Sequence, residues 1–346
     1  MNRAKSSVRK AIFAIAAAVL LLLAGAGGYV CYVLFTPNFS PAQTQYIYIY
    51  PEKDFSDLCR QLQEAGCSHI ESFRKATQLL NYQDELKTGR YAIHSGLNNY
   101  SLLKDLRRGE QAPVRITFNN IRLKEDLAER LSEQLMLDDN ELLVLMNDSE
   151  YCAAMGFIPQ TIKAMFIPNT YEVYWTISAE KLMQRMKQEF TAFWTPERLE
   201  KAENIHLSPV EVSVLASIVE EESAVADEYP VIAGLYINRL RKGIPLQADP
   251  TVKYAAGDFT LKRILDVHLR TDSPYNTYLH EGLPPGPLRV PSITALNATL
   301  NYKQHNYLYM CAKEDFSGRH NFAVTLAEHN RNAKLYHQAL NKRNIR

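Results

Sequence analysis

Glu222 is the side chain in this sequence with the clearest potential for acid catalysis. It ends the segment Val214-Leu215-Ala216-Ser217-Ile218-Val219-Glu220-Glu221-Glu222, whose composition and spacing predict a helix. With about 100° of rotation per residue, one apolar face of this helix would carry Leu215, Ile218, Val219, Val225, Ala226 and Tyr229. Glu222 falls in the middle of this face, whereas Glu220 points the opposite way and Glu221 lies between them.

A carboxyl group on a buried face is costly to ionise, so its pKa rises. A carboxylic acid that keeps its proton near neutral pH is what general acid catalysis needs. The pattern therefore predicts that Glu222 is a general acid. The structural alternative is a glutamate that is paired with a lysine or arginine, or bonded to backbone, since such pairs also perturb pKa values.

Polar side chains of the kind that bind sugars gather in the segments that follow this helix. These segments are Leu246-Gln247-Ala248-Asp249-Pro250-Thr251, Ser273-Pro274-Tyr275-Asn276-Thr277-Tyr278, and His320-Asn321-Phe322 followed by His329-Asn330. Between them, Gly282-Leu283-Pro284-Pro285-Gly286-Pro287 predicts a rigid loop, because prolines lock φ and glycines permit turns. Each segment alone is equally typical of an ordinary polar loop.

Taken together and in order, these segments resemble a known family. The stretches Ala216 to Ser223, Asn238-Arg239-Leu240, Leu246 to Val252, Ser273 to Tyr278 and Gly282 to Pro287 are similar to those of the endolytic murein transglycosylases of the MltG (YceG-like) family. The resemblance covers nearly the whole chain. In that family the second glutamate of a Glu-x-Glu-[Ser/Thr] stretch is the catalytic acid, which places the role on Glu222 here. Ser223 after it is similar to the Glu-Ser pair of other lytic transglycosylases.

The sequence departs from the family pattern at two places. Glu221 stands where the family commonly has lysine, which adds a like charge that would raise the pKa of Glu222 if the two groups are close. Lys163-Ala164 stands where the family often has Glu-Gly, and Asn169 replaces an aspartate a few residues later. The segment around Asn169 therefore lacks the acidic residues of the family pattern.

The resemblance implies cleavage of the β-1,4 bond between N-acetylmuramic acid and N-acetylglucosamine in peptidoglycan, with a 1,6-anhydro-muramyl product. It implies neither a metal nor a cofactor. Protonated Glu222 would donate to the glycosidic oxygen, and ionised Glu222 would then take the proton of the sugar's own 6-hydroxyl, which is already attached and so needs no external water. We expect activity on the acidic to neutral side. Candidates for holding the sugars or orienting Glu222 are Gln247, Asp249, Tyr275, Asn276, Thr277 and Asn321.

Two other functions fit the same residues. A hydrolase of the same bond would use water and a second carboxylate, with Glu220, Glu221 or Asp249 in that role. A non-catalytic protein would bind peptidoglycan at the membrane and serve as a scaffold. The position of Glu222 argues against the scaffold, because a binding module needs no carboxylate on a core face.

Length and composition set the outer bounds. The chain has 346 residues, enough for two domains, with 46% hydrophobic and 22% charged residues, as in ordinary globular proteins. A net charge of +1 gives no electrostatic case for nucleic acid as a partner. Cys59, Cys67, Cys152 and Cys311 lack paired CxxC spacing, which argues against a metal site. Cys59 and Cys67 are candidates for a disulfide in an oxidising compartment.

The N-terminus predicts a membrane anchor. Residues 11–35 form a run of 25 residues without a charge, which is long enough to cross a bilayer. The basic residues Arg3, Lys5, Arg9 and Lys10 precede it, so residues 1–10 should stay in the cytoplasm and the rest should be exported. The alternative is a signal peptide cleaved near Ala24-Gly25-Ala26, but the apolar run continues past that point.

These features predict an α+β chain in several parts. Residues 36–45 read as a linker, residues 46–112 as a small β-α-α-β module, and residues 113–346 as a larger mixed α+β catalytic domain. The family resemblance makes the small module LysM-like. It also implies glycan strands and the cytoplasmic membrane as partners, adds peptidoglycan synthases as candidates, and places the enzyme in the periplasm or on the cell-wall side.

Overall fold

The computed structural model describes residues 2–52, 54–82, 86–261 and 263–343, without the side chains of residues 2–6 and 8. The chain divides into two compact units. Unit 1 comprises Met1–Val114 and Glu172–Thr176, and unit 2 comprises Arg115–Tyr171 and Ile177–Arg346. The division falls near the boundary that the sequence predicts after residue 112, but it assigns residues 172–176, which lie within the predicted catalytic domain, to unit 1.

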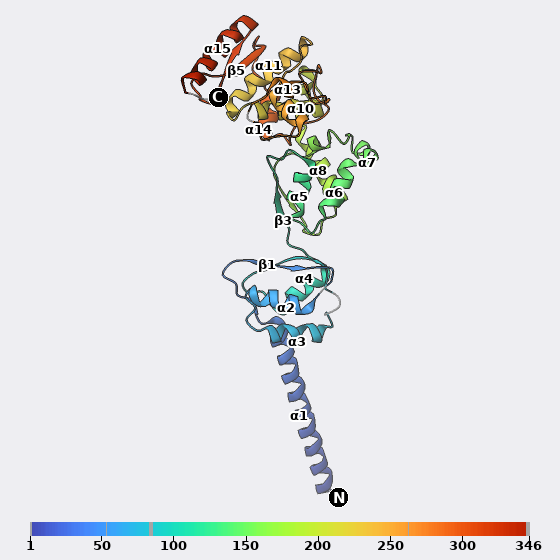
Figure 1. The fold of residues 1–346 in the computed structure, drawn as a ribbon. Helices are drawn as coiled ribbons and strands as arrows, with labels where there is room; N and C mark the ends of the chain where they lie inside the picture. Colours follow the sequence, from blue (N-terminus) through green and yellow to red (C-terminus); the bar gives the residue numbers. More distant parts are fainter. Residues whose placement is uncertain (1, 53, 83–85, 262, 344–346) are drawn as a thin grey trace. The chain divides into compact units, whose positions relative to one another are not determined.

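Unit 1 contains the expected β-α-α-β order (Figure 1). Its elements are α1 (Asn2–Phe35), β1 (Gln45–Ile49), α2 (Phe55–Glu64), α3 (Ile70–Leu80), β2 (Gly89–Ile93) and α4 (Asn99–Arg108). Strands β1 and β2 are antiparallel, with Gln45 opposite Ile93. Alternate residues of the two strands, including Ile47 and Tyr91, are buried and form the core together with leucines of the helices. The likeness of this module to LysM stays a prediction.

Residues 36–45 differ from the linker that we expected, because they belong to the fold of unit 1. Phe39 is 1% exposed and forms a bridge with Cys67. The buried side chain of Asn38 donates to Asn99 Oδ1 at 2.8 Å and accepts from the backbone N of His69 at 2.9 Å. A chain this well bonded is a fixed connection between α1 and β1. The thiols of Cys59 and Cys67 are both free.

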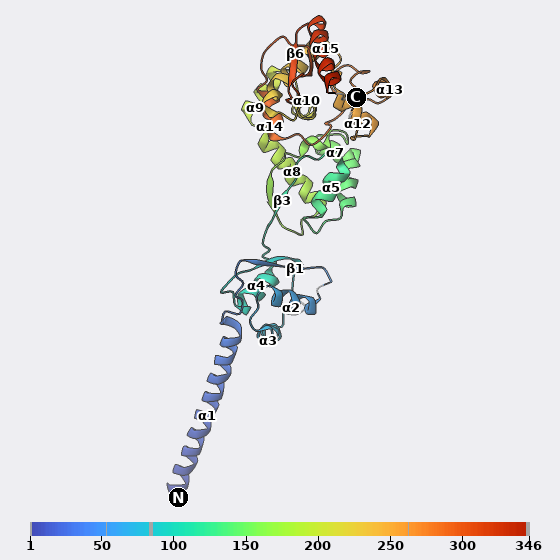
Figure 2. The same cartoon turned by 60° about the vertical axis from the view of Figure 1, so that its left-hand side comes forward.

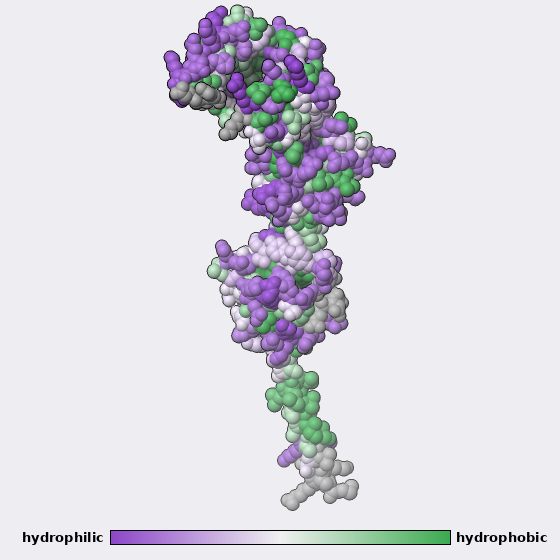
Figure 3. Space-filling view, in the orientation of Figure 1, coloured by the Kyte–Doolittle hydropathy of each residue, from purple (hydrophilic) through white to green (hydrophobic). Residues whose placement is uncertain are grey.

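Helix α1 carries the expected apolar segment. Its residues Arg9–Phe35 include an 18-residue window with a mean hydropathy of 2.4, and the segment is long and apolar enough to cross a bilayer. Figure 3 shows the apolar surface that covers this helix. The last turn differs from the expectation of a span reaching Phe35, because Val33 and Leu34 are buried in the core of unit 1.

Unit 2 is mainly helical (Figure 2). In chain order its helices are α5 (Lys124–Ser132), α6 (Asp139–Asn147), α7 (Ser149–Ala154), η1 (Ile162–Met165), α8 (Ala179–Phe193), α9 (Pro196–Asn204), α10 (Pro209–Glu222), η2 (Ala226–Glu228), α11 (Tyr229–Arg241), α12 (Asp249–Ala256), α13 (Asp266–Leu269), α14 (Ile293–Leu300) and α15 (Leu326–Lys342). Strand β3 (Val114–Thr117) pairs with β4 (Thr170–Val173), and β5 (Tyr309–Ala312) pairs with β6 (His320–Ala323). Helix α15 packs against β5 and β6. The elements confirm an α+β chain.

Helix α10 is shorter and more deeply buried than the apolar stripe in the sequence predicts. Ser208 and Glu211 form a capping box, and Pro209 occupies the first turn. Residues Val212 to Val219 are all buried, since α10 packs against α11, α12 and α14. The helix therefore has no single apolar face, and the prediction of one apolar stripe reaching Tyr229 is wrong.

The end of α10 explains this difference. Ser223 is extended, with φ −138° and ψ 137°, and its hydroxyl accepts a hydrogen bond from the backbone N of Val225 at 3.1 Å. Serine hydroxyls compete in this way with helical backbone bonds. Glu222 is consequently the last residue of α10, and Ala226 and Tyr229 start new helices. The chain turns away directly after Glu222 and leaves a cavity beside its carboxyl group.

Candidate active site

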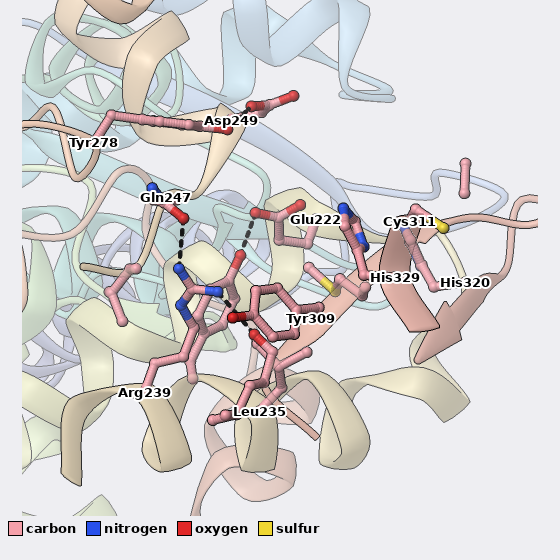
Figure 4. A pocket seen from close by; sticks show the side chains of 15 residues that line it. Glu222, Leu235, Arg239, Gln247, Asp249, Tyr278, Tyr309, Cys311, His320 and His329 are labelled. Atoms are coloured by element: carbon pink, nitrogen blue, oxygen red, sulfur yellow. Dashed lines mark hydrogen bonds between the residues drawn. The ribbon is translucent and has the colours of Figure 1, made fainter. Parts of the chain in front are cut away.

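The carboxyl group of Glu222 lines a cavity of about 350 Å³ (Figure 4). The wall is made by the end of α10, by α11, by the start of α12 with the chain before it, by Tyr278, by β5 and β6, and by α15. The polar side chains of this wall are Tyr236, Arg239, Gln247, Asp249, Tyr278, Tyr309, His320 and His329. The cavity thus combines one acid with hydrogen-bonding and aromatic groups, which is the type of lining that a sugar needs.

The surroundings of Glu222 keep its proton near neutral pH. The pKa of Glu222 is raised to about 7, chiefly because burial removes the carboxylate from water. A hydrogen bond from the Tyr236 hydroxyl to Oε1, 2.5 Å long, lowers this pKa, and the negative charge of Asp249 raises it. Burial also raises the pKa of the Tyr236 hydroxyl, which therefore stays a donor. The raised pKa that we inferred from the helix pattern agrees with this environment.

Tyr236→Phe should shift the pH profile of any reaction in which Glu222 acts as an acid. Because the lost hydrogen bond stabilises the carboxylate, the pKa of Glu222 should rise further above 7. The fall of kcat/KM on the alkaline side should then move to higher pH. The measurement is kcat/KM from pH 4 to 10 for both proteins, and an alkaline limb that stays in place or moves to lower pH would contradict the assignment.

Arg239 of α11 joins the chain before α12 to the chain before β5 in the wall of the cavity. Its guanidinium donates to the carbonyl oxygens of Pro245 at 2.9 Å and Leu308 at 2.7 Å, and to Gln247 Oε1 at 2.6 Å. Gln247 has a φ of 50°, an uncommon conformation for a residue other than glycine. Its Nε2 has no hydrogen bond within the described part of the chain, and Gln247 is exposed and lines the cavity. Gln247 thus agrees in position with the predicted sugar-binding role.

Asp249 is the second predicted residue that the structure brings to the cavity. It is the first residue of α12, and its Oδ1 accepts a 2.7 Å hydrogen bond from the Tyr278 hydroxyl. Its charge raises the pKa of Glu222, so the two carboxyl groups sense each other. The cavity therefore holds two carboxyl groups, a fact that bears on the choice of mechanism.

The other predicted binding residues do not line this cavity. Asn276 is fully buried, and its Nδ2 donates to the carbonyl oxygens of Leu269 and Thr271 at 3.0 and 2.9 Å. The hydroxyl of Thr277 lies 2.8 Å from that of Thr251 and accepts from the backbone N of Ala248. These bonds fix the loops that carry Gln247 and Tyr278, so both side chains act on the site through the backbone.

Tyr275 and Asn321 also point elsewhere. The ring of Tyr275 packs against Tyr254, with 4.6 Å between ring centroids. Asn321 in β6 donates to Glu314 at 2.7 Å. A motif shared with a family marks a segment as important, but it does not separate side chains that contact a ligand from those that shape a loop.

Glu220 and Glu221 are held away from the cavity in a cluster of charges. Glu221 accepts from Arg122 at 2.7 Å and from Arg289 at 3.0 Å. Glu220 accepts from the backbone N of Ser292 at 2.8 Å. Because Glu221 is neutralised by two arginines, its effect on the pKa of Glu222 is small beside burial, Tyr236 and Asp249. This arrangement leaves Asp249 as the candidate for a second carboxylate.

Lys163, at a departure from the family pattern, is a buried hub beside this cluster. It is 2% exposed, and its Nζ donates to the carbonyl oxygens of Arg122 at 2.5 Å and Leu288 at 3.4 Å, and to the Tyr254 hydroxyl at 3.1 Å. Burial lowers its pKa to about 7. Lys163 thereby joins the backbone at Arg122 to that beside Arg289, the two residues that hold Glu221.

Reasoning from sequence missed several groups that make the site. Tyr236 and Arg239 lie on one face of α11 at a spacing of three residues, a pattern that could have marked them. Tyr309 and His329 reach the cavity from β5 and α15, elements remote in the sequence. Within the described residues, no group of three or more His, Cys, Asp or Glu side chains is placed to hold a metal ion.

Comparisons with known proteins agree with the resemblance. The chain is 27% identical over 356 residues to an endolytic murein transglycosylase of Streptococcus pneumoniae serotype 2, strain D39, an alignment that covers 92% of this chain and 64% of that protein. An endolytic murein transglycosylase of Bacillus subtilis strain 168 is 36% identical over 166 residues, which are 48% of this chain and 45% of that protein. The chain thus spans less than two thirds of the length of these relatives.

A solved structure and a family model extend the agreement. The crystal structure of a YceG-like protein from Listeria monocytogenes superimposes with a TM-score of 0.55 at 26% identity, covering 84% of this chain and 98% of that one. The model of the YceG-like family matches residues 47–335, which include parts of both units and every residue of the cavity wall. On these findings the chain belongs to the YceG-like family.

Proposed function

We propose that this protein is a membrane-anchored endolytic lytic transglycosylase of peptidoglycan. The observation that carries the proposal is Glu222, an acid with a pKa near 7 in a cavity lined by groups that bind sugars. The names of the pneumococcal and Bacillus relatives point to the same substrate. The apolar helix α1 supports an anchor in the cytoplasmic membrane, with the enzyme on the outer face where new strands emerge.

The reaction needs one proton carrier. Protonated Glu222 gives its proton to the oxygen between N-acetylmuramic acid and N-acetylglucosamine as the bond to the anomeric carbon breaks. The carboxylate, stabilised by the Tyr236 hydroxyl, then takes the proton of the 6-hydroxyl, whose oxygen bonds to the anomeric carbon. Glu222 is protonated again at the end, and the muramyl product is a 1,6-anhydro sugar. A pKa near the working pH lets one group serve in both directions.

A water-using muramidase is the second candidate, because Asp249 shares the cavity with Glu222. Two carboxyl groups are the usual equipment of glycoside hydrolases. The two functions differ in where the oxygen of the product comes from. A transglycosylase uses the 6-hydroxyl, whereas a hydrolase adds an oxygen atom from water.

Digestion in H₂¹⁸O distinguishes the two directly. The full chain in detergent micelles is incubated with glycan strands, and the products are read by mass spectrometry. We expect anhydro-muramyl ends without ¹⁸O. Reducing ends labelled with one ¹⁸O would establish the muramidase instead. The absence of any product from the wild-type protein would favour a binding scaffold.

Asp249→Asn tests the role of the second carboxyl group. For the transglycosylase we expect activity within about 10-fold of the wild type, since the change leaves Glu222 in place. Removing the negative charge should lower the pKa of Glu222, so the alkaline limb should move to lower pH, opposite to Tyr236→Phe. A hydrolase that uses Asp249 would instead lose about 10²-fold or more. The measurement is kcat/KM against pH.

A further inference from the structure

Ser223, Glu228 and His320 form a hydrogen-bonded chain directly beside Glu222. The Ser223 hydroxyl donates to Glu228 Oε2 at 3.1 Å. The same oxygen accepts from His320 Nδ1 at 3.0 Å, and Oε1 accepts from the backbone N of His320 at 2.9 Å. Ser223 and Glu228 are each 6% exposed. A buried carboxylate with this many donors is a fixed point in the structure.

His320 is the member of this chain that reaches the cavity. It is the first residue of β6 and lines the same wall as Glu222 (Figure 4). Because Nδ1 is bonded to Glu228, the neutral ring carries its proton on Nδ1 and leaves Nε2 as an acceptor. Nε2 has no hydrogen bond within the part of the chain that the structure describes.

The second histidine of the cavity wall lacks this arrangement. The Nδ1 of His329 is buried and makes no hydrogen bond with any described residue. Its ring lies against Tyr309, with 5.6 Å between centroids, and burial lowers its pKa. Of the two rings, only that of His320 is oriented by a carboxylate, as a ring must be if it is to hold a ligand in one position.

We propose that His320 is a substrate-binding residue whose Nε2 accepts a hydrogen bond from a sugar hydroxyl, and that Glu228 positions it. The inference rests on the proposed function, because it names a further contact for the same substrate. Through Ser223, Glu228 also connects this contact to the end of α10, next to Glu222. One carboxylate thereby sets the positions of a substrate ligand and of the catalytic acid.

Two substitutions of His320 separate a substrate contact from a structural link. The amide of asparagine reaches the place of Nδ1, so His320→Asn keeps the bond to Glu228 and removes the group that faces the cavity. The amide of glutamine reaches the place of Nε2, so His320→Gln keeps a group in the cavity. His320→Asn should raise KM for glycan strands about 10- to 100-fold, and His320→Gln should restore part of that loss.

Binding gives a readout that does not require turnover. In a Glu222→Gln background of the full chain, the Kd for glycan strands should rise about 10- to 100-fold with His320→Asn. Glu228→Gln alone should raise Kd by a smaller factor. In a His320→Ala background, Glu228→Gln should leave Kd unchanged, since a positioning residue acts only through the group it positions. The matched control is Asp227→Asn, which breaks an exposed 2.7 Å ion pair with Arg319 between the same two segments.

The outcomes decide the inference separately from the function. Wild-type KM and Kd in His320→Asn, whose bond to Glu228 is kept, would overturn the substrate contact. A rise in Kd in Asp227→Asn as large as that in His320→Asn would also overturn it. Breaking any contact between these two segments would then be enough to weaken glycan binding. If the wild type released no anhydro product, the proposed function would fail. The Kd measurements in the Glu222→Gln background would still decide whether His320 binds glycan.

Discussion

Replacing Glu222 by glutamine is expected to lower the rate of glycan cleavage by about 10⁴-fold, at the upper end of what a positioned acid or base contributes. The reason is that, in the proposed mechanism, the same carboxyl group serves twice, first as the donor to the glycosidic oxygen and then as the acceptor of the 6-hydroxyl proton. Glutamine has nearly the same volume, and its Oε1 can still accept from the Tyr236 hydroxyl. The loss would therefore report the missing proton and leave the cavity intact.

The measurement is the initial rate of anhydro-end formation by the full chain in micelles at pH 6. Glu203→Gln, an exposed glutamate in α9, is the matched control and should keep the wild-type rate. Unchanged Kd for glycan strands in Glu222→Gln would show that the substrate still binds. A variant that retains more than about one hundredth of the wild-type rate would contradict a general acid at this position.

Much of the fold follows from local pattern. The helix that ends at Glu222, the apolar helix α1 and the β-α-α-β order of unit 1 lie where the sequence predicts them. In each case the signal is local, such as apolar spacing in a helix or alternation in a strand. The prediction fails where tertiary packing decides, as in α10, which is buried on all sides and lacks the single apolar face that its residue spacing predicts.

The sequence singled out Glu222 and two residues of the cavity wall, Gln247 and Asp249, but it missed most of that wall. Glu222 stood out because a carboxylate among apolar residues is unusual, although the helix that carries it is buried on all sides and ends at Glu222 itself. Asn276 and Thr277 were placed in the binding site because amides and hydroxyls can bind sugars. The same groups can bind other parts of the protein: Asn276 donates to carbonyl oxygens of its own loop, and the Thr277 hydroxyl bonds with that of Thr251 in α12. Hydrogen-bonding capacity does not reveal which partner is nearby.

The proposed catalytic acid should also destabilise the folded protein, and Glu222→Gln should show by how much. The folded pKa of about 7 lies above the ordinary value of 4.5. The folded state therefore binds the proton more tightly than the unfolded state, and stability is lost as pH rises from about 4.5 to 7. Above pH 7 the ionised carboxylate carries the full penalty, about 3 kcal/mol at 1.36 kcal/mol per pKa unit. Water in the cavity makes this an upper value.

Glutamine does not titrate, so the variant should escape this penalty. We expect its free energy of unfolding to exceed that of the wild type by up to about 3 kcal/mol at pH 8 and to match it near pH 4.5. Urea unfolding of unit 2 can be followed through Trp194 in a Trp175→Phe background, because Trp175 lies in unit 1 and the chain has 2 tryptophans. A stability difference that is the same at both pH values would mean that Glu222 does not titrate between them. An inactive variant that is more stable only at high pH would instead tie catalysis and instability to the same buried proton.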